Sequence, residues 1–306
     1  MSVSPPPVVA IMGPTAAGKS DLAVQLARAL GGEVVNGDSM QLYRGMDIGT
    51  AKLPVMERAG VPHHLLDVLD VGEPATVRQF QMWARHAIVD CLARGRTAIV
   101  VGGSALYLRA VLDQLDFPAT DAGLRADLEQ QLERNGPAAL YQELQHRDPG
   151  AASVIAASNG RRIVRALEVN VLTGQPFRAN LPPPVHAFDT VVQLGLAVPR
   201  DVLDQRIGAR VDHMWRQGLV DEVRGLELIG LREGRTASRA LGYRQVLAML
   251  AGECDETQAR DVTVRATRKF ARRQGAWFRR DARIRWSQFD APDLLAQAVH
   301  AVRSML

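Results

Sequence analysis

Blocks of apolar residues recur along the first hundred positions and are separated by segments of helical periodicity. Five consecutive apolar residues, Val8 to Met12, predict a short buried strand. The helical pattern over residues 20–30 ends at Gly31-Gly32, as expected of a helix C-cap. The alternation continues with a strand at 33–36, a helix at 76–94, a strand at 97–101 and a helix that opens at Gly102-Gly103-Ser104. Strands that alternate with helices predict a parallel sheet with crossover connections.

The pattern changes near residue 115. Helical periodicity then runs through 122–135, 137–146 and 161–173 with no clear strand between them, and a proline-rich connector follows at 175–188. An apolar strand returns at 190–198, and the remaining third is mostly helical, over 200–217, 220–229, 238–251 and 256–280. We therefore predict an α/β core formed by residues 1–114 and 189–306, interrupted by a mostly helical insertion domain, residues 115–188.

Composition narrows the class of protein. Hydrophobic residues make up 47% and charged residues 23% of the chain, which indicates a globular protein, and no stretch approaches a membrane span. Residues 1–7 lack the features of a secretory signal, so a cytoplasmic location is expected. The two cysteines, Cys91 and Cys254, lie far apart without zinc-ligand spacing, which argues against a disulfide scaffold or a zinc module. His63-His64 has no further ligand at a suitable spacing, so ordinary hydrogen bonding is expected there.

A complete phosphate-binding loop follows the first predicted strand. It matches G-x-x-x-x-G-K-[ST] and comprises Gly13, Pro14, Thr15, Ala16, Ala17, Gly18, Lys19 and Ser20. Its glycines let backbone N–H groups turn toward anionic oxygens, and the following helix aims its positive end at the same place. Lys19 adds a cation, and the Ser20 hydroxyl is a candidate Mg²⁺ ligand. The loop predicts phosphate binding within a P-loop NTPase-like sheet, but it does not specify a reaction.

The parts that usually accompany such a loop in nucleotide-driven proteins are missing. The sequence has no N-K-x-D for reading guanine, and the strand at 97–101 ends in glycines where an ATPase carries a metal-binding aspartate. Asp67 is a possible substitute, although a turn role fits it equally well. Two classes remain: a small kinase, or a transferase whose substrate resembles nucleotide phosphates.

An acidic residue, Asp38, stands directly after the second strand. The carboxyl ends of strands are where parallel sheets build their sites, so Asp38 is a candidate general base. An ordinary loop or cap role for this aspartate is the alternative.

Basic residues gather near the end of the chain. Although the net charge is only +4, nine basic residues fall between positions 265 and 285: Arg265, Arg268, Lys269, Arg272, Arg273, Arg279, Arg280, Arg283 and Arg285. Helical spacing would place several on one face, where they could bind a polyanion such as RNA. A solvated helix whose aromatic residues belong to the core is the alternative. Further clusters at 161–165 and 239–244 favour a nucleic-acid substrate over a metabolite.

Ordered motifs across nearly the whole chain resemble those of the tRNA dimethylallyltransferases. They are Gly-Pro-Thr-Ala-Ala-Gly-Lys-Ser, Asp-Ser-Met-Gln, Gly-Met-Asp-Ile-Gly-Thr-Ala-Lys, His-His-Leu-Leu-Asp, Val-Gly-Gly-Ser-Ala-Leu-Tyr, Arg-Ala-Leu-Glu-Val, Arg-Ala-Leu-Gly-Tyr-Arg and Lys-Phe-Ala-Arg-Arg-Gln-x-x-Trp-Phe-Arg. The resemblance implies transfer of a dimethylallyl group from dimethylallyl diphosphate to N6 of adenosine 37 in the tRNA anticodon stem-loop. Its departures are local: Ser20 and Ser104 replace the common threonines, and Leu53 precedes Pro54.

Roles for individual residues follow from this resemblance. Residues 15–20 would bind the diphosphate, with Mg²⁺ held partly by Ser20, and Thr15 would take part in catalysis. Asp38 would be the general base, and either Arg206 or Arg210 would reach the diphosphate. Positions expected to contact tRNA are Asp38, Ser39, Met40, Gln41, Ser104, Arg125, Arg161, Arg162, Ile163, Val164, Arg165, Arg239, Ala240, Leu241, Gly242, Tyr243 and Arg244.

We expect the enzyme to act as a monomer, with no membrane partner. Two other functions remain as alternatives: a kinase acting on a nucleoside or small acid, and a non-catalytic RNA-binding protein with a vestigial phosphate loop. The intact Lys19 and Ser20 argue against the second of these.

Overall fold

A computed structural model describes residues 6–305 of the chain. By its internal contacts the chain divides into two compact units, which are described separately. The core unit comprises the residues up to Asp113 and those from His186 onward, and the insertion unit is Gln114–Val185. The insertion predicted from the sequence comprised residues 115–188.

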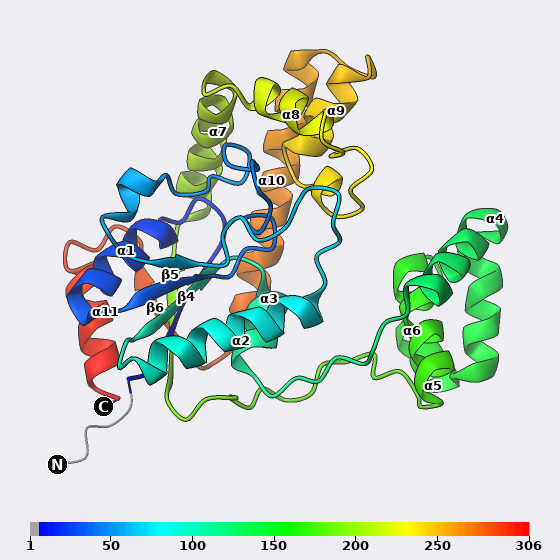
Figure 1. Cartoon of the computed structure of the whole chain (residues 1–306), viewed down its shortest axis with the longest axis horizontal. Coiled ribbons are helices and arrows are strands. Elements are labelled where there is room, and N and C mark those ends of the chain that lie inside the picture. The colour runs from blue at the N-terminus through cyan, green and yellow to red at the C-terminus, as the bar shows by residue number, and fades with distance from the viewer. Residues whose placement is uncertain (1–5, 306) are drawn as a thin grey trace. The chain divides into compact units, whose positions relative to one another are not determined.

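The core unit is built on a six-stranded sheet whose paired strands are all parallel (Figure 1). Its order is β3-β2-β4-β1-β5-β6. The strands are β1 (Val8–Met12), β2 (Glu33–Asn36), β3 (His63–His64), β4 (Ala98–Gly102), β5 (Val191–Ala197) and β6 (Ile284–Gln288). The predicted α/β fold with a parallel sheet is thus confirmed.

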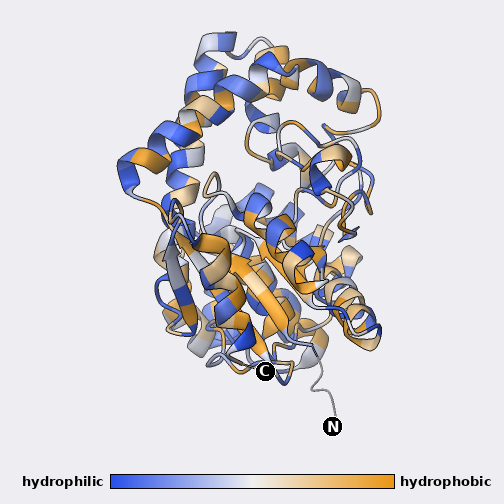
Figure 2. Ribbon diagram, turned by 90° about the vertical axis from the view of Figure 1, so that its left-hand side faces the viewer, coloured by the Kyte–Doolittle hydropathy of each residue, from blue (hydrophilic) through white to orange (hydrophobic). Residues whose placement is uncertain are grey.

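Helices cover both faces of the sheet, which explains why the central strands are apolar on both sides (Figures 1 and 2). On one face, α1 (Lys19–Leu30) and α11 (Leu294–Arg303) pack against Val9 and Ile11. On the other, α2 (Val77–Ala93) and α3 (Ala105–Leu112) pack against Val8 and Ala10. The remaining core helices are α7 (Arg200–Arg216), α8 (Leu219–Glu227), α9 (Tyr243–Leu250) and α10 (Glu256–Phe278).

The carboxyl ends of β1, β2 and β4 lie side by side, so the loops that follow them meet. The backbone N–H of Gly37 donates to the carbonyl of Val101 at 2.7 Å. A Cβ atom on Gly102 would lie only 2.5 Å from the Gly37 carbonyl oxygen, so glycine is required where these two loops cross. This close packing brings the segment after β2 next to the segment after β4.

The insertion unit is a small helical domain with its own apolar core. Its helices are α4 (Ala122–Arg147), α5 (Pro149–Val154) and α6 (Gly160–Thr173). The helical pattern of α4 is broken at Gly136, whose φ is +73°, so the two helical segments expected at 122–135 and 137–146 are separate, as the sequence indicated. Leu128, Leu144 and Leu167 pack together in the core of this unit.

Five features of the structure differ from the expected elements. The helix expected at 238–251 is instead a 3-10 turn, η2 (Ala237–Arg239), followed by α9, because Gly242 has a φ of +88° that interrupts the helix. The short helices α5 and α11 were not expected, and neither were β3 and β6. β3 has only two residues, and Ile284 is the one buried residue of β6, so neither forms a buried apolar run. In the described part of the chain, no helix is long and apolar enough to cross a membrane.

Candidate active site

The phosphate-binding loop lies at the carboxyl end of β1, where the chain turns into α1. Gly18 has a left-handed backbone conformation, with a φ of +95°, that favours glycine, and it caps the helix. The Lys19 side chain folds back over the loop and donates a hydrogen bond from Nζ to the Pro14 carbonyl oxygen at 2.7 Å. The positive end of α1 faces the same loop, so these groups together favour an anion.

Three charged side chains meet at this loop. Burial and, to a smaller extent, the neighbouring Arg210 guanidinium together lower the pKa of Lys19 to about 8, while the Asp38 carboxylate acts in the opposite direction. The pKa of Arg210 is also lowered by burial and raised by Asp38. Two partly desolvated cations beside one carboxylate leave a surplus of positive charge, which a bound anion would compensate.

Both candidate arginines of α7 face the phosphate-binding loop. Arg210 donates from Nη1 to Thr15 Oγ1 at 3.2 Å and from Nη2 to the Thr50 carbonyl oxygen at 3.4 Å. The Cζ atom of Arg206 lies 5.0 Å from the centre of the Phe289 ring. Its Nη2 is 3.7 Å from the position that a Cβ atom on Gly18 would take, which places the guanidinium beside the loop. Arg206 has no ion-pair partner among residues 6–305. The sequence could not choose between them, and the structure brings both to the loop.

Asp38 is held in place by its neighbour at the end of β2. The Asn36 side chain accepts a hydrogen bond from the Asp38 N–H and donates one to the Asp38 carbonyl oxygen, each at 2.9 Å. Asp38 Oδ1 accepts from the backbone N–H of Met40 at 2.9 Å, and Oδ2 has no hydrogen-bond partner within the described chain. One carboxylate oxygen therefore stabilises the turn, and the other is available to accept a proton.

Other residues near Asp38 that were predicted to contact tRNA differ in whether their side chains already form hydrogen bonds within the protein. The Gln41 amide donates to the carbonyl oxygens of Thr50 at 3.1 Å and Ala51 at 3.4 Å, so it supports the protein's own loop. Ser104 begins α3, and its side chain makes no capping hydrogen bond. Burial raises the pKa of Tyr107 to about 12, while a hydrogen bond with the Ser39 side chain opposes that shift.

Gln274, in α10, is a residue that the sequence analysis assigned no role. Its Oε1 accepts the backbone N–H of Thr15 at 2.9 Å, and its Nε2 donates to the Gly103 carbonyl oxygen at 2.8 Å. The side chain is buried and joins the phosphate-binding loop to the loop after β4. The sequence signal for Gln274 was its place in the Lys-Phe-Ala-Arg-Arg-Gln-x-x-Trp-Phe-Arg motif, where it is an uncharged polar residue within an arginine-rich helix.

Asp67 does not lie free for a metal ion. Its carboxylate pairs with the ammonium of Lys52 at 2.5 Å, and the same ammonium pairs with Asp47 at 2.6 Å and donates to the Tyr43 carbonyl oxygen at 2.9 Å. The φ of Asp67 is +57°, as in a turn. This supports the turn role over the substitute metal ligand.

Within the cluster at 239–244, only the two arginines are exposed. Neither Arg239 nor Arg244 has an ion-pair partner in the described chain. Tyr243 is buried, and its hydroxyl donates to Glu222 Oε1 at 2.5 Å; Glu222 also accepts from the backbone N–H groups of residues 47–49 at 2.7–3.2 Å. The tyrosine therefore anchors a loop. The other members of the cluster are partly or fully buried: Ala240, Leu241 and Gly242.

In the insertion unit, most of the predicted RNA-binding residues have partners of their own. Arg125 and Arg165 both pair with Glu168, whose side chain is fully buried. Arg162 donates to the Ala179 carbonyl oxygen. Arg161 is exposed and has no ion-pair partner among the residues described. The two apolar members of this cluster belong to the domain core: Ile163 and Val164.

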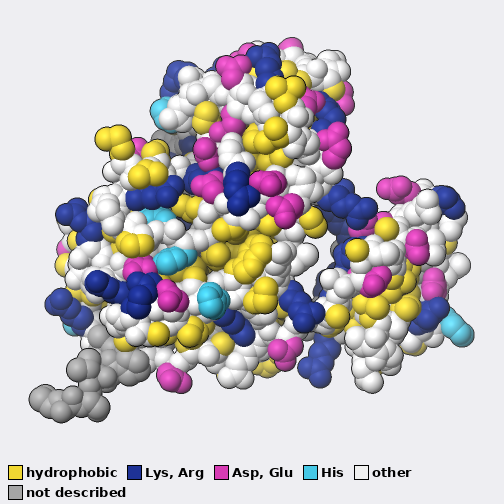
Figure 3. All heavy atoms as spheres, viewed as in Figure 1, with side chains coloured by type: hydrophobic (Ala, Val, Ile, Leu, Met, Phe, Trp, Pro, Cys, Tyr) yellow, Lys and Arg dark blue, Asp and Glu magenta, His cyan; other side chains and the backbone are white. Residues whose placement is uncertain are grey.

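The basic segment at 265–285 combines structural and exposed charges. Arg268 donates to the Asp204 carbonyl oxygen at 3.0 Å, and Arg283 pairs with Asp113 and Asp281, each at 2.6 Å. Phe278 is buried in the core, as the alternative interpretation expected. On the face shown in Figure 3, basic side chains of the core unit are interspersed with acidic ones. The exposed basic residues of this segment are Arg265, Lys269, Arg272, Arg273, Arg279, Arg280 and Arg285.

A parallel sheet with a phosphate-binding loop after its first strand and an acid after its second defines the class: an α/β protein of the P-loop type. Residues 41–281 match the family model for IPP transferase, and the chain belongs to this family. The resemblance seen in the sequence motifs is thereby confirmed.

Relatives match over nearly the full length. A tRNA dimethylallyltransferase of Streptomyces coelicolor is 63% identical over 288 residues, which cover 94% of this chain and 92% of the relative. The Thermobifida fusca tRNA dimethylallyltransferase is 58% identical, with coverages of 95% and 92%.

Two solved structures share the fold. The full-length tRNA isopentenylpyrophosphate transferase of Bacillus halodurans superposes with a TM-score of 0.72 at 39% identity, covering 98% of this chain and 96% of that one. A eukaryotic dimethylallyltransferase acting on tRNA superposes with a TM-score of 0.80 at 28% identity, with coverages of 95% and 76%.

Proposed function

We propose that this protein transfers the dimethylallyl group of dimethylallyl diphosphate to N6 of an adenosine in tRNA, at position 37 beside the anticodon, and releases diphosphate. One observation carries the proposal: a carboxylate with a free oxygen, Asp38, shares its surroundings with the two half-buried cations Lys19 and Arg210. Such a site can take up a proton on one side and stabilise an anionic leaving group on the other. The names of the relatives agree with this reaction.

The chemistry needs both halves of that site. The exocyclic amine of adenosine is a weak nucleophile because its lone pair is delocalised into the ring. As the amine nitrogen bonds to C1 of the allylic group, the C1–O bond breaks and its electron pair leaves with the diphosphate. The amine proton passes to Oδ2 of Asp38. Lys19, Arg210 and the backbone of the phosphate-binding loop stabilise the departing charge.

The proposal includes Mg²⁺ at the diphosphate. The ion prefers oxygen ligands and commonly keeps several waters while it binds one or two protein oxygens and substrate phosphates. Ser20 fits this role, because it is exposed at the start of α1 and its hydroxyl has no hydrogen-bond partner within residues 6–305. When bound, Mg²⁺ would neutralise part of the charge that develops on the diphosphate.

The RNA partner we propose is the anticodon stem-loop, bound by a monomer in the cytoplasm. Support comes from the exposed arginines without ion-pair partners in the described chain, Arg239, Arg244 and Arg161, whose charges are available for phosphates. We assign Arg125 and Arg165 a supporting role instead, since both are paired with Glu168.

The decisive test is mass spectrometry of tRNA nucleosides after incubation with protein, Mg²⁺ and dimethylallyl diphosphate. Alkylated adenosine is expected with the wild type. Asp38→Asn and Asp38→Ala should lower kcat by about 10²–10⁴-fold while RNA binding persists. Asp290→Ala, at an exposed aspartate far along the chain, serves as the matched control.

Three other outcomes would lead to different conclusions. Full activity of both Asp38 variants would refute the base assignment. ATP consumption in the absence of RNA, without alkyl transfer, would identify a kinase. RNA binding without alkyl transfer, together with no calorimetric signal for diphosphate, would identify a non-catalytic RNA-binding protein.

A further inference from the structure

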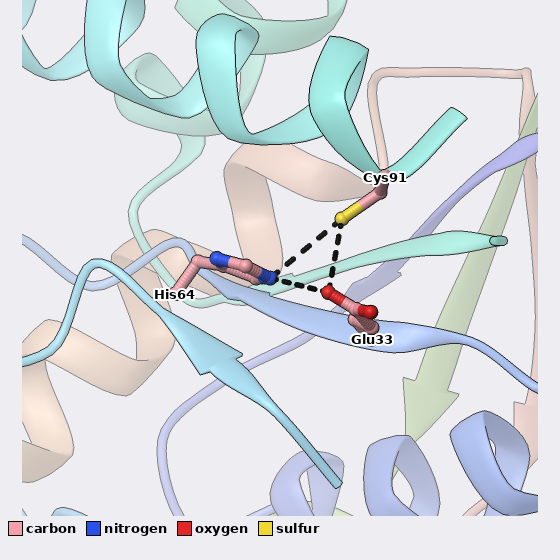
Figure 4. A group of neighbouring side chains, drawn as sticks. All are labelled: Glu33, His64 and Cys91. Carbon is pink, nitrogen blue, oxygen red and sulfur yellow. Dashed lines mark hydrogen bonds and ion pairs between the residues drawn. The ribbon is translucent and has the colours of Figure 1, made fainter. Parts of the chain in front are cut away.

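A second cluster of reactive side chains lies at the opposite end of the sheet from the phosphate-binding loop. It joins Glu33, at the amino end of β2, to His64 in β3 and Cys91 near the end of α2 (Figure 4). Figure 4 shows Glu33 Oε2, His64 Nε2 and Cys91 Sγ pointing toward one another. The proposed transfer reaction uses none of them. No third ligand for the histidine pair is visible in the sequence, because these residues are brought together only by the pairing of β2 with β3 and the packing of α2.

We propose that Glu33, His64 and Cys91 form a binding site for a borderline-soft divalent cation of the Zn²⁺ type. Thiolate, imidazole and carboxylate are the three side-chain ligands that Zn²⁺ takes in proteins. In the described part of the chain, these residues form a group whose candidate ligand atoms all lie within 4.8 Å of one another.

The distances fit a tetrahedral ion with one adjustment. Metal–ligand bonds of about 2.0–2.3 Å place neighbouring ligand atoms of a tetrahedron roughly 3.3–3.6 Å apart. Cys91 Sγ lies 3.5 Å from Glu33 Oε2 and 3.7 Å from His64 Nε2, close to that spacing. His64 Nε2 and Glu33 Oε2 are hydrogen-bonded at 2.7 Å and must separate by about half an ångström. A rotation about the side-chain torsions of His64, which is 28% exposed, can provide this.

The partial exposure of His64 also provides an entry path from the solvent, which would supply a water molecule as the fourth ligand. Arg94 is the main competitor, since its guanidinium pairs with both oxygens of Glu33. Its side chain is 43% exposed and also pairs with Asp90, so Nη2 can leave Oε2 to the metal while Nη1 stays on Oε1. The positive charge of Arg94, which stays next to the site, repels a divalent cation and lowers its affinity. We therefore expect moderate metal affinity in the wild type and higher affinity in Arg94→Gln.

Binding must also displace a proton. Burial raises the pKa of the Cys91 thiol to about 12, with the Glu33 charge acting in the same direction, so the metal-free residue is a neutral thiol. A thiolate–metal bond therefore forms as the S–H bond breaks and the proton passes to the solvent. His64 has to give up its hydrogen bond to Glu33 and bind as the neutral imidazole. Affinity should consequently rise about tenfold per pH unit in the neutral range.

Cobalt(II) provides a test independent of transferase activity, because thiolate coordination produces a sulfur-to-cobalt charge-transfer band in the near ultraviolet. Metal-stripped wild-type protein should develop this band, saturate at one equivalent, and lose it when Zn²⁺ is added. The chain has two cysteines, so Cys254→Ser is a matched control that should keep the band, whereas Cys91→Ser should lose it. His64→Gln should weaken binding by at least about tenfold.

A thermal shift provides the second measurement and does not depend on the absorption band. Zn²⁺ should raise the Tm of the wild type and of Cys254→Ser, should raise that of His64→Gln less, and should leave that of Cys91→Ser unchanged. Far-ultraviolet circular dichroism checks that each variant is folded. Absence of the charge-transfer band in folded wild type, or its persistence in Cys91→Ser, would overturn the proposal. The cluster would then be a hydrogen-bonded link between β2, β3 and α2.

Discussion

Gln274 offers the sharpest test of how the phosphate-binding loop is held. Its side-chain amide accepts from the Thr15 N–H at 2.9 Å and donates to the Gly103 carbonyl at 2.8 Å, in a buried position. Gln274→Met keeps the length of the side chain and removes both hydrogen bonds. Gln274→Glu keeps the acceptor for Thr15, but places a second acceptor against the Gly103 carbonyl and adds negative charge beside the loop.

The magnitude follows from what each variant leaves unpaired. A buried polar group that loses its partner costs about 1–3 kcal/mol, so Gln274→Met, which leaves one N–H and one C=O unpaired, should lower the free energy of unfolding by about 2–6 kcal/mol. The freed loop should also bind diphosphate less well, raising KM for dimethylallyl diphosphate by about tenfold, which corresponds to about 1.4 kcal/mol. Gln274→Glu should raise KM further at neutral pH, because its charge repels the diphosphate, and should recover part of the loss at lower pH.

Urea denaturation and steady-state kinetics with dimethylallyl diphosphate as the varied substrate measure both effects. Gln297→Met is the matched control, because Gln297 is an exposed glutamine of α11 whose side chain hydrogen-bonds, within residues 6–305, only to Asp293; its effect should stay within about 0.5 kcal/mol. If Gln274→Met behaved like Gln297→Met in both measurements, the proposed link between α10 and the loop would be refuted.

The remaining predictions concern charge. Because the pKa of Lys19 is about 8, the lysine loses its positive charge above that pH, and KM for dimethylallyl diphosphate should rise about tenfold per pH unit. Between pH 8 and 10.5 the unfolded chain binds more protons at Lys19 than the folded chain, so the free energy of unfolding should increase with pH in this range. Glu222→Ala leaves three backbone N–H groups without their acceptor and should cost about 2–4 kcal/mol of stability in urea. Arg283→Ala removes a partner of the buried Asp113 and should cost a similar amount. Arg244→Ala should weaken RNA binding and lower the salt slope by about one in filter-binding assays.

Each of these predictions has its own contrary outcome. A flat KM between pH 7 and 9 would mean that the Lys19 ammonium is not needed for binding the substrate. Unchanged urea midpoints for the Glu222 and Arg283 variants would show that these carboxylate contacts do not contribute to the fold. For Arg244→Ala, an unaltered salt slope would remove this side chain from the RNA-binding surface.

The sequence by itself determined most of the secondary elements of the α/β core and the identity of the phosphate-binding loop. Both depend on local patterns: an apolar run such as β1, helical periodicity such as that of α1, and a loop whose eight residues are contiguous. The order of the motifs was enough to recognise the family. The hydrophobic pattern did not reveal β3 and β6, because these short strands at the two edges of the sheet carry no apolar run of their own.

Only the tertiary structure decided which side chains meet and which charges are already paired. Arg210 reaches Thr15, and Cys91 reaches His64, through strand order and helix packing, which no local spacing encodes. The same holds for the basic clusters: Arg165 and Arg283 are as basic in sequence as Arg244, but buried carboxylates hold the first two. The physical reason is that local periodicity reports which face of an element is buried, whereas the partner of each side chain depends on segments far away in the chain.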